Sequence, residues 1–112
     1  IMMPPSFVNI GAYVDQDTLI DSHVLVGSCA QIGKRVHLGA GVKIGGVLEP
    51  VGSMPVIIED DTFVGAGAVI TEGILIRKEA VIAPGVVLSA AIPIYDTVKQ
   101  TIYRGIIPEK AV

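Results

Sequence analysis

Few side chains in this 112-residue sequence could bind a metal ion or act as a general base. Apart from eleven acidic residues, the candidates are one cysteine, Cys29, and two histidines, His23 and His37. Zinc sites in proteins use three or four Cys, His or carboxylate ligands. Two histidines and one cysteine therefore predict no metal site. Either histidine could serve instead as a general base in a transfer reaction.

Asp21 is the carboxylate best suited to orient or deprotonate an amine. It directly follows Ile20, an inward-facing residue of the repeat described below, so its side chain should point away from the core. Gly39 lies one coil further along the repeat and leaves space beside the carboxylate. The competing interpretation is an ordinary solvated acid on the surface.

A six-residue repeat must position these side chains. A branched aliphatic residue recurs every six residues from Val8 to Ile44, and again from Ile58 to Ile94. The residue four places later is mostly small or β-branched. A period of six fits a short strand followed by a corner, and three such units close a triangular coil of about 18 residues. The sequence therefore predicts an all-β, parallel β-helix in which Val8, Val26 and Ile44 form one stacked column.

The repeat also sets the expected domain organisation. We expect one β-helix over residues 1–98, with a loop inserted at about 49–57, where two prolines and a glycine interrupt the ladder. Residues 99–112 are expected to cap the open end as a strand or hairpin. Handedness does not follow from the period, although parallel crossovers are usually right-handed.

Composition excludes several classes of function. Eight basic residues stand against eleven acidic ones and are scattered, which disfavours nucleic-acid binding. The longest uncharged stretch, residues 80–95, is short and contains two prolines, so no membrane-spanning helix is expected. A single cysteine cannot form an internal disulfide, and no signal peptide is visible, which favours the cytoplasm.

Several segments resemble the tetrahydrodipicolinate N-succinyltransferases of bacterial lysine and diaminopimelate synthesis, within the hexapeptide-repeat acyltransferases. They include PSFVNIGAYVD at 5–15, VGSCAQIGK at 26–34, VHL at 36–38 and IGGVLEP at 44–50, with IYD at 94–96 and YRG at 103–105. The resemblance implies a left-handed helix, a cytoplasmic homotrimer, and a succinyl-CoA site between neighbouring subunits. The α/β domain that precedes the helix in this family has no counterpart in the sequence.

The resemblance also assigns roles to individual residues. Asp21 matches the aspartate that contacts the substrate amino group, and His23 replaces a bulky aromatic residue, so it would reshape the substrate pocket. Glu49, at the head of the loop, is a further candidate for substrate binding. Small outward residues suit the pantetheine arm of the acyl donor: Gly46, Ala66 and Ala83. Gly67 and Val69 stand where some relatives carry an arginine and an acid implicated in catalysis.

Glycine occupies the second repeat position four times in succession, at Gly27, Gly33, Gly39 and Gly45. These glycines either ease tight stacking of the coils or let a ligand approach the backbone. The leading functional hypothesis is succinyl transfer from succinyl-CoA to tetrahydrodipicolinate, without a metal. The alternatives are the corresponding N-acetyltransferase and a non-catalytic trimeric scaffold or truncated copy, which Gly67 and Val69 favour.

Overall fold

The computed structural model describes residues 1–47 and 54–112, and every regular element in this part of the chain is a β-strand. Most strands are two residues long, because the chain turns a corner in every six-residue unit. Fourteen strands form three parallel sheets, and β14 (Ile94–Asp96) and β15 (Thr101–Tyr103) form an antiparallel hairpin.

Each sheet forms one side of a triangular prism and is named here after its first strand. The β1 sheet contains β1 (Phe7–Val8), β4 (Leu25–Val26), β7 (Lys43–Ile44), β10 (Val69–Ile70) and β13 (Val87–Leu88). The β2 sheet contains β2 (Tyr13–Val14), β5 (Gln31–Ile32), β8 (Ile57–Ile58), β11 (Leu75–Ile76) and β16 (Ile106–Ile107). The β3 sheet contains β3 (Leu19–Ile20), β6 (His37–Leu38), β9 (Phe63–Val64) and β12 (Val81–Ile82).

Register across the sheets confirms the predicted columns. Val8 pairs with Val26, and Val26 pairs with Ile44, as the six-residue period requires. Ile44 then pairs with Ile70, across the insertion in the sequence. Val26, Ile44 and Ile70 are each 0% exposed, so these residues of the β1 sheet face a core from which solvent is excluded. Stacked branched aliphatics of this kind supply the burial that two-residue strands cannot achieve alone.

The inward corner positions are small or β-branched, as expected. Val24, Ala30, Ala68 and Ala80 are buried there. A buried threonine at such a corner needs a hydrogen-bond partner, and Thr18 has two: its hydroxyl donates to the Gly33 carbonyl at 2.8 Å and accepts from the Val36 amide at 3.2 Å.

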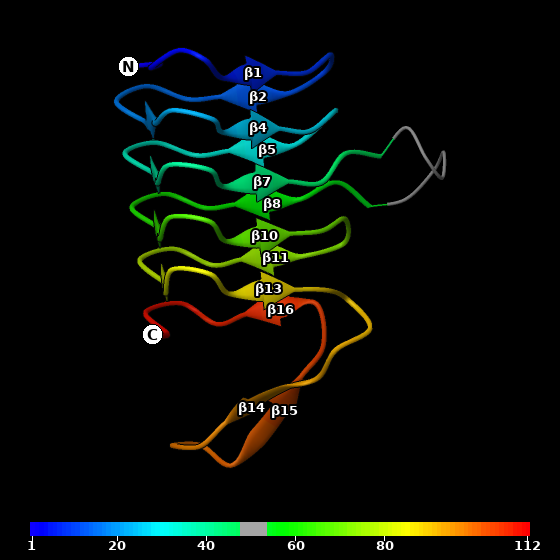
Figure 1. Ribbon diagram of the computed structural model, residues 1–112. Helices are drawn as coiled ribbons and strands as arrows, with labels where there is room; N and C mark the ends of the chain where they lie inside the picture. The colour runs from blue at the N-terminus through cyan, green and yellow to red at the C-terminus, as the bar shows by residue number, and fades with distance from the viewer. Residues whose placement is uncertain (48–53) are drawn as a thin grey trace.

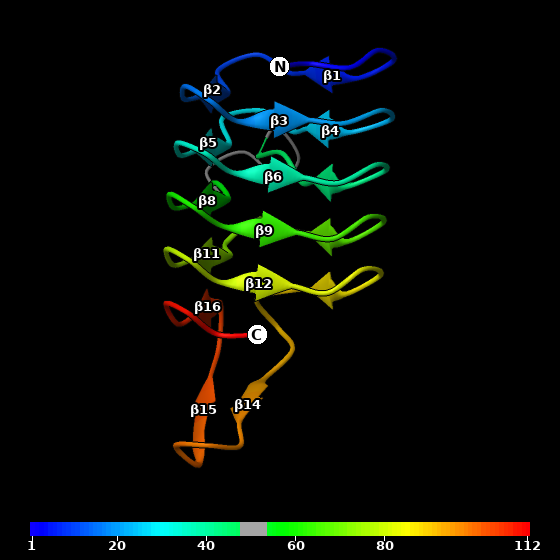
Figure 2. The ribbon, with the colours of Figure 1, turned by 90° about the vertical axis from the view of Figure 1, so that its left-hand side faces the viewer.

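The helix is left-handed. Figure 1 shows the coils stacked from the N-terminus downward, and Figure 2 shows the β3 sheet facing the viewer. Together the two views show that the chain, seen from its N-terminal end, turns counterclockwise as it recedes. The fold is thus the predicted left-handed parallel β-helix, and it is an exception to the right-handed preference of parallel crossovers.

Three corners run along the prism, and we name them by their turns. The glycine corner, between the β3 and β1 sheets, contains residues 21–24, 39–42, 65–68 and 83–86. The charged corner, between the β2 and β3 sheets, contains residues 15–18, 33–36, 59–62, 77–80 and 108–111. The loop corner lies between the β1 and β2 sheets and includes residues 9–12, 27–30 and 71–74.

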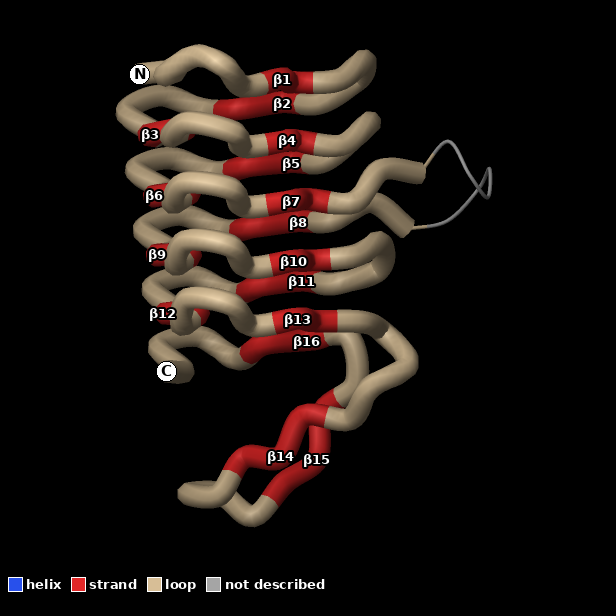
Figure 3. Tube along the Cα trace, in the orientation of Figure 1, coloured by secondary structure: helices blue, strands red, loops and turns tan. Residues whose placement is uncertain are grey.

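The ladder is interrupted twice, after β7 and after β13, and both interruptions fall at the loop corner. Figure 3 shows the hairpin β14–β15 extending away from the coil. Residues 48–53, which include much of the expected loop, lie outside the described residues. The ladder resumes beyond them, where Ile57 pairs with Gln31. The hairpin β14–β15 leaves the coil after β13, and β16 then returns to the β2 sheet beside β11. No helix in the described part of the chain has the length and apolar character needed to cross a bilayer.

Candidate functional site

The glycine corner presents a nearly side-chain-free strip headed by polar residues. Its turn tips read Asp-Ser-His at 21–23, Gly-Ala-Gly at 39–41 and 65–67, and Ala-Pro-Gly at 83–85. The third residue of each tip is left-handed, with φ of 63° at His23, 75° at Gly41, 73° at Gly67 and 74° at Gly85. The amide of Gly67 donates to the Ala40 carbonyl at 2.9 Å, and Gly85 bonds Ala66 in the same way. A backbone hydrogen bond thus joins each of these tips to the next one along the corner.

Asp21 lies at the head of this strip and is half-buried. Its backbone amide donates to the Leu38 carbonyl at 3.1 Å, which ties the residue to the next coil. Its Oδ1 accepts a hydrogen bond from the Ser22 amide at 2.7 Å. Its Oδ2 has no hydrogen-bond partner among the described residues. One carboxylate oxygen is thus fixed by the turn, while the other can accept a proton or an N–H group from a ligand.

Two of the glycines in the strip are open to approach, whereas the glycines at the second repeat position, on the strip and on the loop corner, are closed by packing. A Cβ added at Gly39 would lie 2.8 Å from the Ala66 amide nitrogen, and one at Gly27 would lie 2.5 Å from the backbone of Gly45. Glycine at these second repeat positions is required by coil stacking. At Gly67 and Gly85, by contrast, an added Cβ would meet no heavy atom within 4 Å. A ligand can therefore reach the backbone at these two tips, where the positive φ already favours glycine.

His23 shares the turn with Asp21, whereas His37 does not. His23 is exposed, and its amide donates to the Pro5 carbonyl at 2.6 Å. His37 lies on the outer face of the β3 sheet, where its ring stacks on Phe63 with 4.6 Å between centroids and 3° between planes. His23 is thus the histidine whose side chain can meet a ligand beside Asp21.

The remaining candidates fall in different places. Ala66 and Ala83 are exposed tips of the glycine corner, below Asp21. Ala83 also borders a hollow of about 660 Å³ between the last coil and the hairpin. Gly46 lies on the loop corner, where an added Cβ would be 2.5 Å from the Ser28 hydroxyl. Glu49 lies outside the described residues. The structure therefore places Asp21, His23, Ala66 and Ala83 along one corner, in different coils, and it places Gly46 on another corner.

Lys43 is a residue of this site that the sequence analysis missed. It lies on β7 in the β1 sheet, and its Nζ donates a hydrogen bond to the backbone carbonyl of His23. A signal was present in the sequence, because Lys43 is the charged member of an outward column that otherwise contains Phe7, Leu25, Val69 and Val87.

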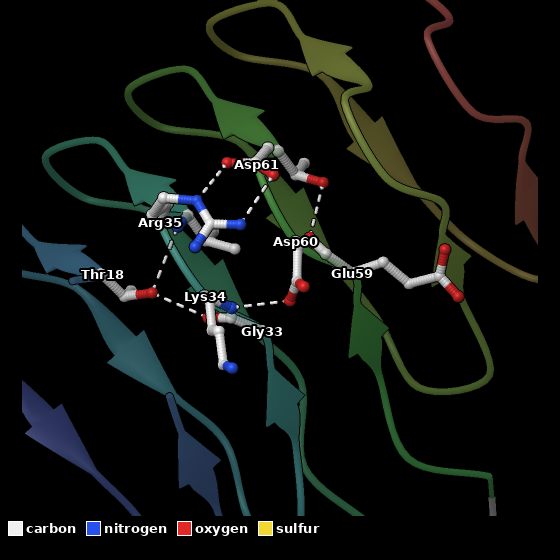
Figure 4. Close-up of polar contacts among 9 residues, drawn as sticks. Thr18, Gly33, Lys34, Arg35, Glu59, Asp60 and Asp61 are labelled. Atoms are coloured by element: carbon white, nitrogen blue, oxygen red, sulfur yellow. Dashed lines mark hydrogen bonds and ion pairs between the residues drawn. The ribbon is translucent and has the colours of Figure 1, made fainter. Parts of the chain in front are cut away.

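Several side chains at the charged corner are paired with one another, as Figure 4 shows for Arg35 and Asp61. Arg35 and Asp61 form an ion pair at 2.7 Å, and Arg77 pairs with Glu59 at 3.0 Å. The hydrogen bond and the charge of Arg35 lower the pKa of Asp61, and the same contact raises the pKa of Arg35. Asp60 Oδ1 accepts from the Lys34 amide at 2.8 Å. These groups satisfy each other, so this corner is better explained by structure than by catalysis.

A groove of about 390 Å³ lies beside the charged corner, on the outer face of the β2 sheet. Tyr13, Gln31 and Ile57 form part of its lining, and Lys78 lies at its edge. Within the described residues, no group of three or more His, Cys, Asp or Glu side chains is arranged to hold a metal ion.

Comparison with known proteins places the chain beside one group of enzymes. Residues 55–90 match a family model described as the hexapeptide repeat of succinyl-transferase. The chain is 54% identical over 112 residues to the 2,3,4,5-tetrahydropyridine-2,6-dicarboxylate N-succinyltransferase of Nitrobacter winogradskyi, covering all of this chain and 40% of that relative. The Rhodopseudomonas palustris enzyme of the same name is also 54% identical over 112 residues, again with 40% of the relative covered. The Acinetobacter baylyi enzyme is 50% identical, with all of this chain and 41% of the relative covered.

These matches confirm the resemblance seen in the sequence. The chain spans about two fifths of the length of the curated relatives it matches.

Proposed function

We propose that this chain is the hexapeptide-repeat part of a 2,3,4,5-tetrahydropyridine-2,6-dicarboxylate N-succinyltransferase. In this proposal it transfers a succinyl group from succinyl-CoA to the nitrogen of tetrahydrodipicolinate, in lysine and diaminopimelate synthesis. The acceptor is a cyclic imine, so water must first add to its C=N bond to give the amine that is acylated. The similarity to enzymes of that name, over the whole of this chain and about two fifths of each enzyme, supports the reaction class. The observation that carries the proposal is the half-buried Asp21 carboxylate at the head of a strip of bare turn tips. Its Oδ2 has no partner within residues 1–47 and 54–112.

The chemistry follows from what acyl transfer to an amine requires. The amine must lose a proton when its nitrogen attacks the thioester carbonyl and the coenzyme thiolate leaves. A carboxylate that is fixed by one oxygen and open at the other can orient the amine and accept that proton. Asp21 meets this description, because the Ser22 amide fixes Oδ1. His23, in the same turn, would line the acceptor side of the pocket.

The strip below Asp21 suits an extended acyl donor. Ala66 and Ala83 are exposed, and Gly67 and Gly85 leave the backbone open. A pantetheine arm is long and narrow, so it gains most from a straight surface without protruding side chains. In this proposal succinyl-CoA lies along the glycine corner with its thioester near Asp21. Gly46, on the other side of the β1 sheet, would act from a neighbouring subunit, and Glu49 stays a proposed substrate-binding residue.

A homotrimer in the cytoplasm is part of the same proposal. Its support is the number of large apolar side chains on the outer faces, among them Phe7 at 58% and Val87 at 57% exposed. Contiguous exposed apolar surface of this kind marks an interaction site in many soluble proteins. Sites formed between subunits would cover these columns and complete the substrate pocket.

The direct test is release of coenzyme thiol from succinyl-CoA and from acetyl-CoA, each with and without tetrahydrodipicolinate. We expect release from succinyl-CoA that requires the acceptor. Acceptor-dependent release from acetyl-CoA alone would contradict the choice of donor and favour the N-acetyltransferase. No acceptor-dependent release with either donor would contradict catalysis by this chain.

One observation favours a non-catalytic scaffold as the second candidate. The family resemblance implies that Gly67 and Val69 stand where some relatives carry an arginine and an acid, so this turn tip and the adjoining β10 lack those two charges. Binding of coenzyme A separates the candidates, because a pure scaffold has no reason to retain the donor site. Saturable binding measured by calorimetry would exclude the scaffold, and its absence would favour it.

A further inference from the structure

The outer face of the β1 sheet is an apolar column with a single charge in its middle. Leu25 pairs with Lys43, and Lys43 pairs with Val69, so the lysine lies directly between two aliphatic neighbours. Phe7 and Val87 extend the column in either direction. The stem of a lysine packs well on such a surface while its ammonium extends to the edge. The position of Lys43 therefore places an apolar floor and a positive charge side by side.

The ammonium of Lys43 is held at the glycine corner. Its Nζ donates to the backbone carbonyl of His23, which is two residues from Asp21. An ammonium has three N–H donors, and no second acceptor for it occurs among the described residues. It also forms no ion pair with any described carboxylate. Lys43 thus brings two unused donors and an unneutralised charge to the turn that holds Asp21.

The other basic residues of the chain lie elsewhere. Five are at or beside the charged corner and two are in the hairpin segment: Lys34, Arg35, Arg77, Lys78, Lys110, Lys99 and Arg104. Arg35, Arg77 and Lys78 are already paired with acids. Among the described residues, Lys43 is accordingly the one cation that can meet an anionic group bound at the head of the strip.

We propose that Lys43 binds the free carboxylate of the acyl donor and so selects a dicarboxylic acyl group over acetyl. The inference rests on the proposed function and specifies its donor. A succinyl group has two methylenes followed by a carboxylate, which match the aliphatic neighbours and the ammonium of Lys43. An acetyl group has neither feature. A charge-assisted hydrogen bond of this kind is strong enough to discriminate between donors.

The test compares three variants of the full chain. Lys43→Met removes the charge and keeps the length of the stem, Lys43→Arg restores a charge, and Lys34→Met makes the same change on the charged corner. Binding of succinyl-CoA and acetyl-CoA is measured by calorimetry, and kcat/KM is measured for each donor with tetrahydrodipicolinate. We expect Lys43→Met to weaken succinyl-CoA binding and lower its kcat/KM by about 10- to 100-fold. The values for acetyl-CoA should not change, Lys43→Arg should recover part of the loss, and Lys34→Met should behave as the unmodified chain.

Each other outcome overturns the inference in a distinguishable way. If the unmodified chain binds neither ester, the proposed function fails and the role of Lys43 fails with it. If it binds both and Lys43→Met changes neither, only the role of Lys43 fails. The acceptor also carries carboxylates, so an equal loss with both donors and a raised KM for tetrahydrodipicolinate would reassign Lys43 to the acceptor. Thermal melting of each variant identifies a loss that comes from misfolding, and Lys43→Arg then decides the question.

Discussion

Arg35 and Asp61 form a two-bond ion pair across the coil that contains the insertion. Arg35 Nε donates to Oδ1 of Asp61 at 2.7 Å, and Nη2 donates to Oδ2 at 3.1 Å. Both residues have left-handed backbone conformations, with φ of 52° and 60°. The Asp61 amide also donates to the Lys34 carbonyl at 2.9 Å. The charged corner thus keeps its register between the two coils that precede and follow the insertion on the loop corner.

This pair predicts a pH dependence of stability. Because Arg35 lowers the pKa of Asp61 below its ordinary value of 3.8, the pair stabilises the folded chain above that value. Its contribution is lost as pH falls through the lower folded-state pKa. The effect should be small, because both side chains are about half exposed. Urea unfolding of the unmodified chain and Asp61→Asn between pH 2 and 7 measures it. The difference between the two should shrink toward low pH, and a constant difference would contradict the assignment.

Asp21→Asn should abolish most acyl transfer. An amide cannot accept the amine proton, and general-base catalysis typically contributes about 10²- to 10⁴-fold. The control is Asp15→Asn, because Asp15 occupies the equivalent turn position on the charged corner and its Oδ1 accepts from the Gln16 amide at 2.8 Å. Steady-state thiol release from both variants is the measurement. Equal turnover in the two variants would remove Asp21 from the mechanism.

Gly39→Ala should destabilise the chain, because the added methyl group would lie 2.8 Å from the Ala66 amide nitrogen. Overpacking of this kind typically costs about 1–3 kcal/mol. Ala40→Ser, on the exposed neighbouring position of the same tip, should change the free energy of unfolding by less than about 0.5 kcal/mol. Chemical denaturation of the two variants makes the comparison. A stable Gly39→Ala variant would show that the coils can separate at this corner.

Ile44→Ala should open a cavity in the middle of the core. Ile44 is 0% exposed and stacks between Val26 and Ile70. The substitution should therefore lower the free energy of unfolding by about 2–5 kcal/mol. Ile10→Ala provides the control, since Ile10 is 73% exposed. A similar fall in the melting temperature of both variants would mean that the coil repacks around the missing side chain.

Light scattering should give a mass about three times the 11.7 kDa of the chain. The reason is that contacts between three subunits would bury the exposed apolar columns on the outer faces. Val87→Asp places a charge in the column of the β1 sheet and should shift the mass toward that of one chain. A single-chain mass for the unmodified protein at micromolar concentration would contradict the trimer.

The six-residue period predicted most of the fold because each short strand of the coil contributes one inward residue to the core. Pairs such as Ile20 with Leu38 then follow from sequence spacing alone. Handedness could not follow, since the same inward pattern fits either hand, and only the resemblance indicated it. The repeat was wrong about Ile94, which fits the six-residue period but begins an antiparallel hairpin in place of another coil strand. The hairpin and the return of β16 to β11 depend on pairings that no six-residue pattern encodes.

The candidate site was only partly predictable. Asp21 was found because it follows an inward aliphatic residue, and the openness of Gly67 and Gly85 depends on the conformation of the tips. Lys43 was missed because its contact is with a backbone carbonyl in the preceding coil, and carbonyl positions are invisible in a list of side chains.

Both interruptions of the ladder lie on the loop corner, so the number of residues in a connection there does not determine the register of the strand that follows. The backbone can gain residues after β7 or extend a hairpin after β13, and the next strand still rejoins its ladder. Insertions should therefore be tolerated better along this one edge than along the other two, where every turn between strands has four residues. The loop corner is accordingly the place to graft a peptide epitope or a fluorescent label without disturbing the coil.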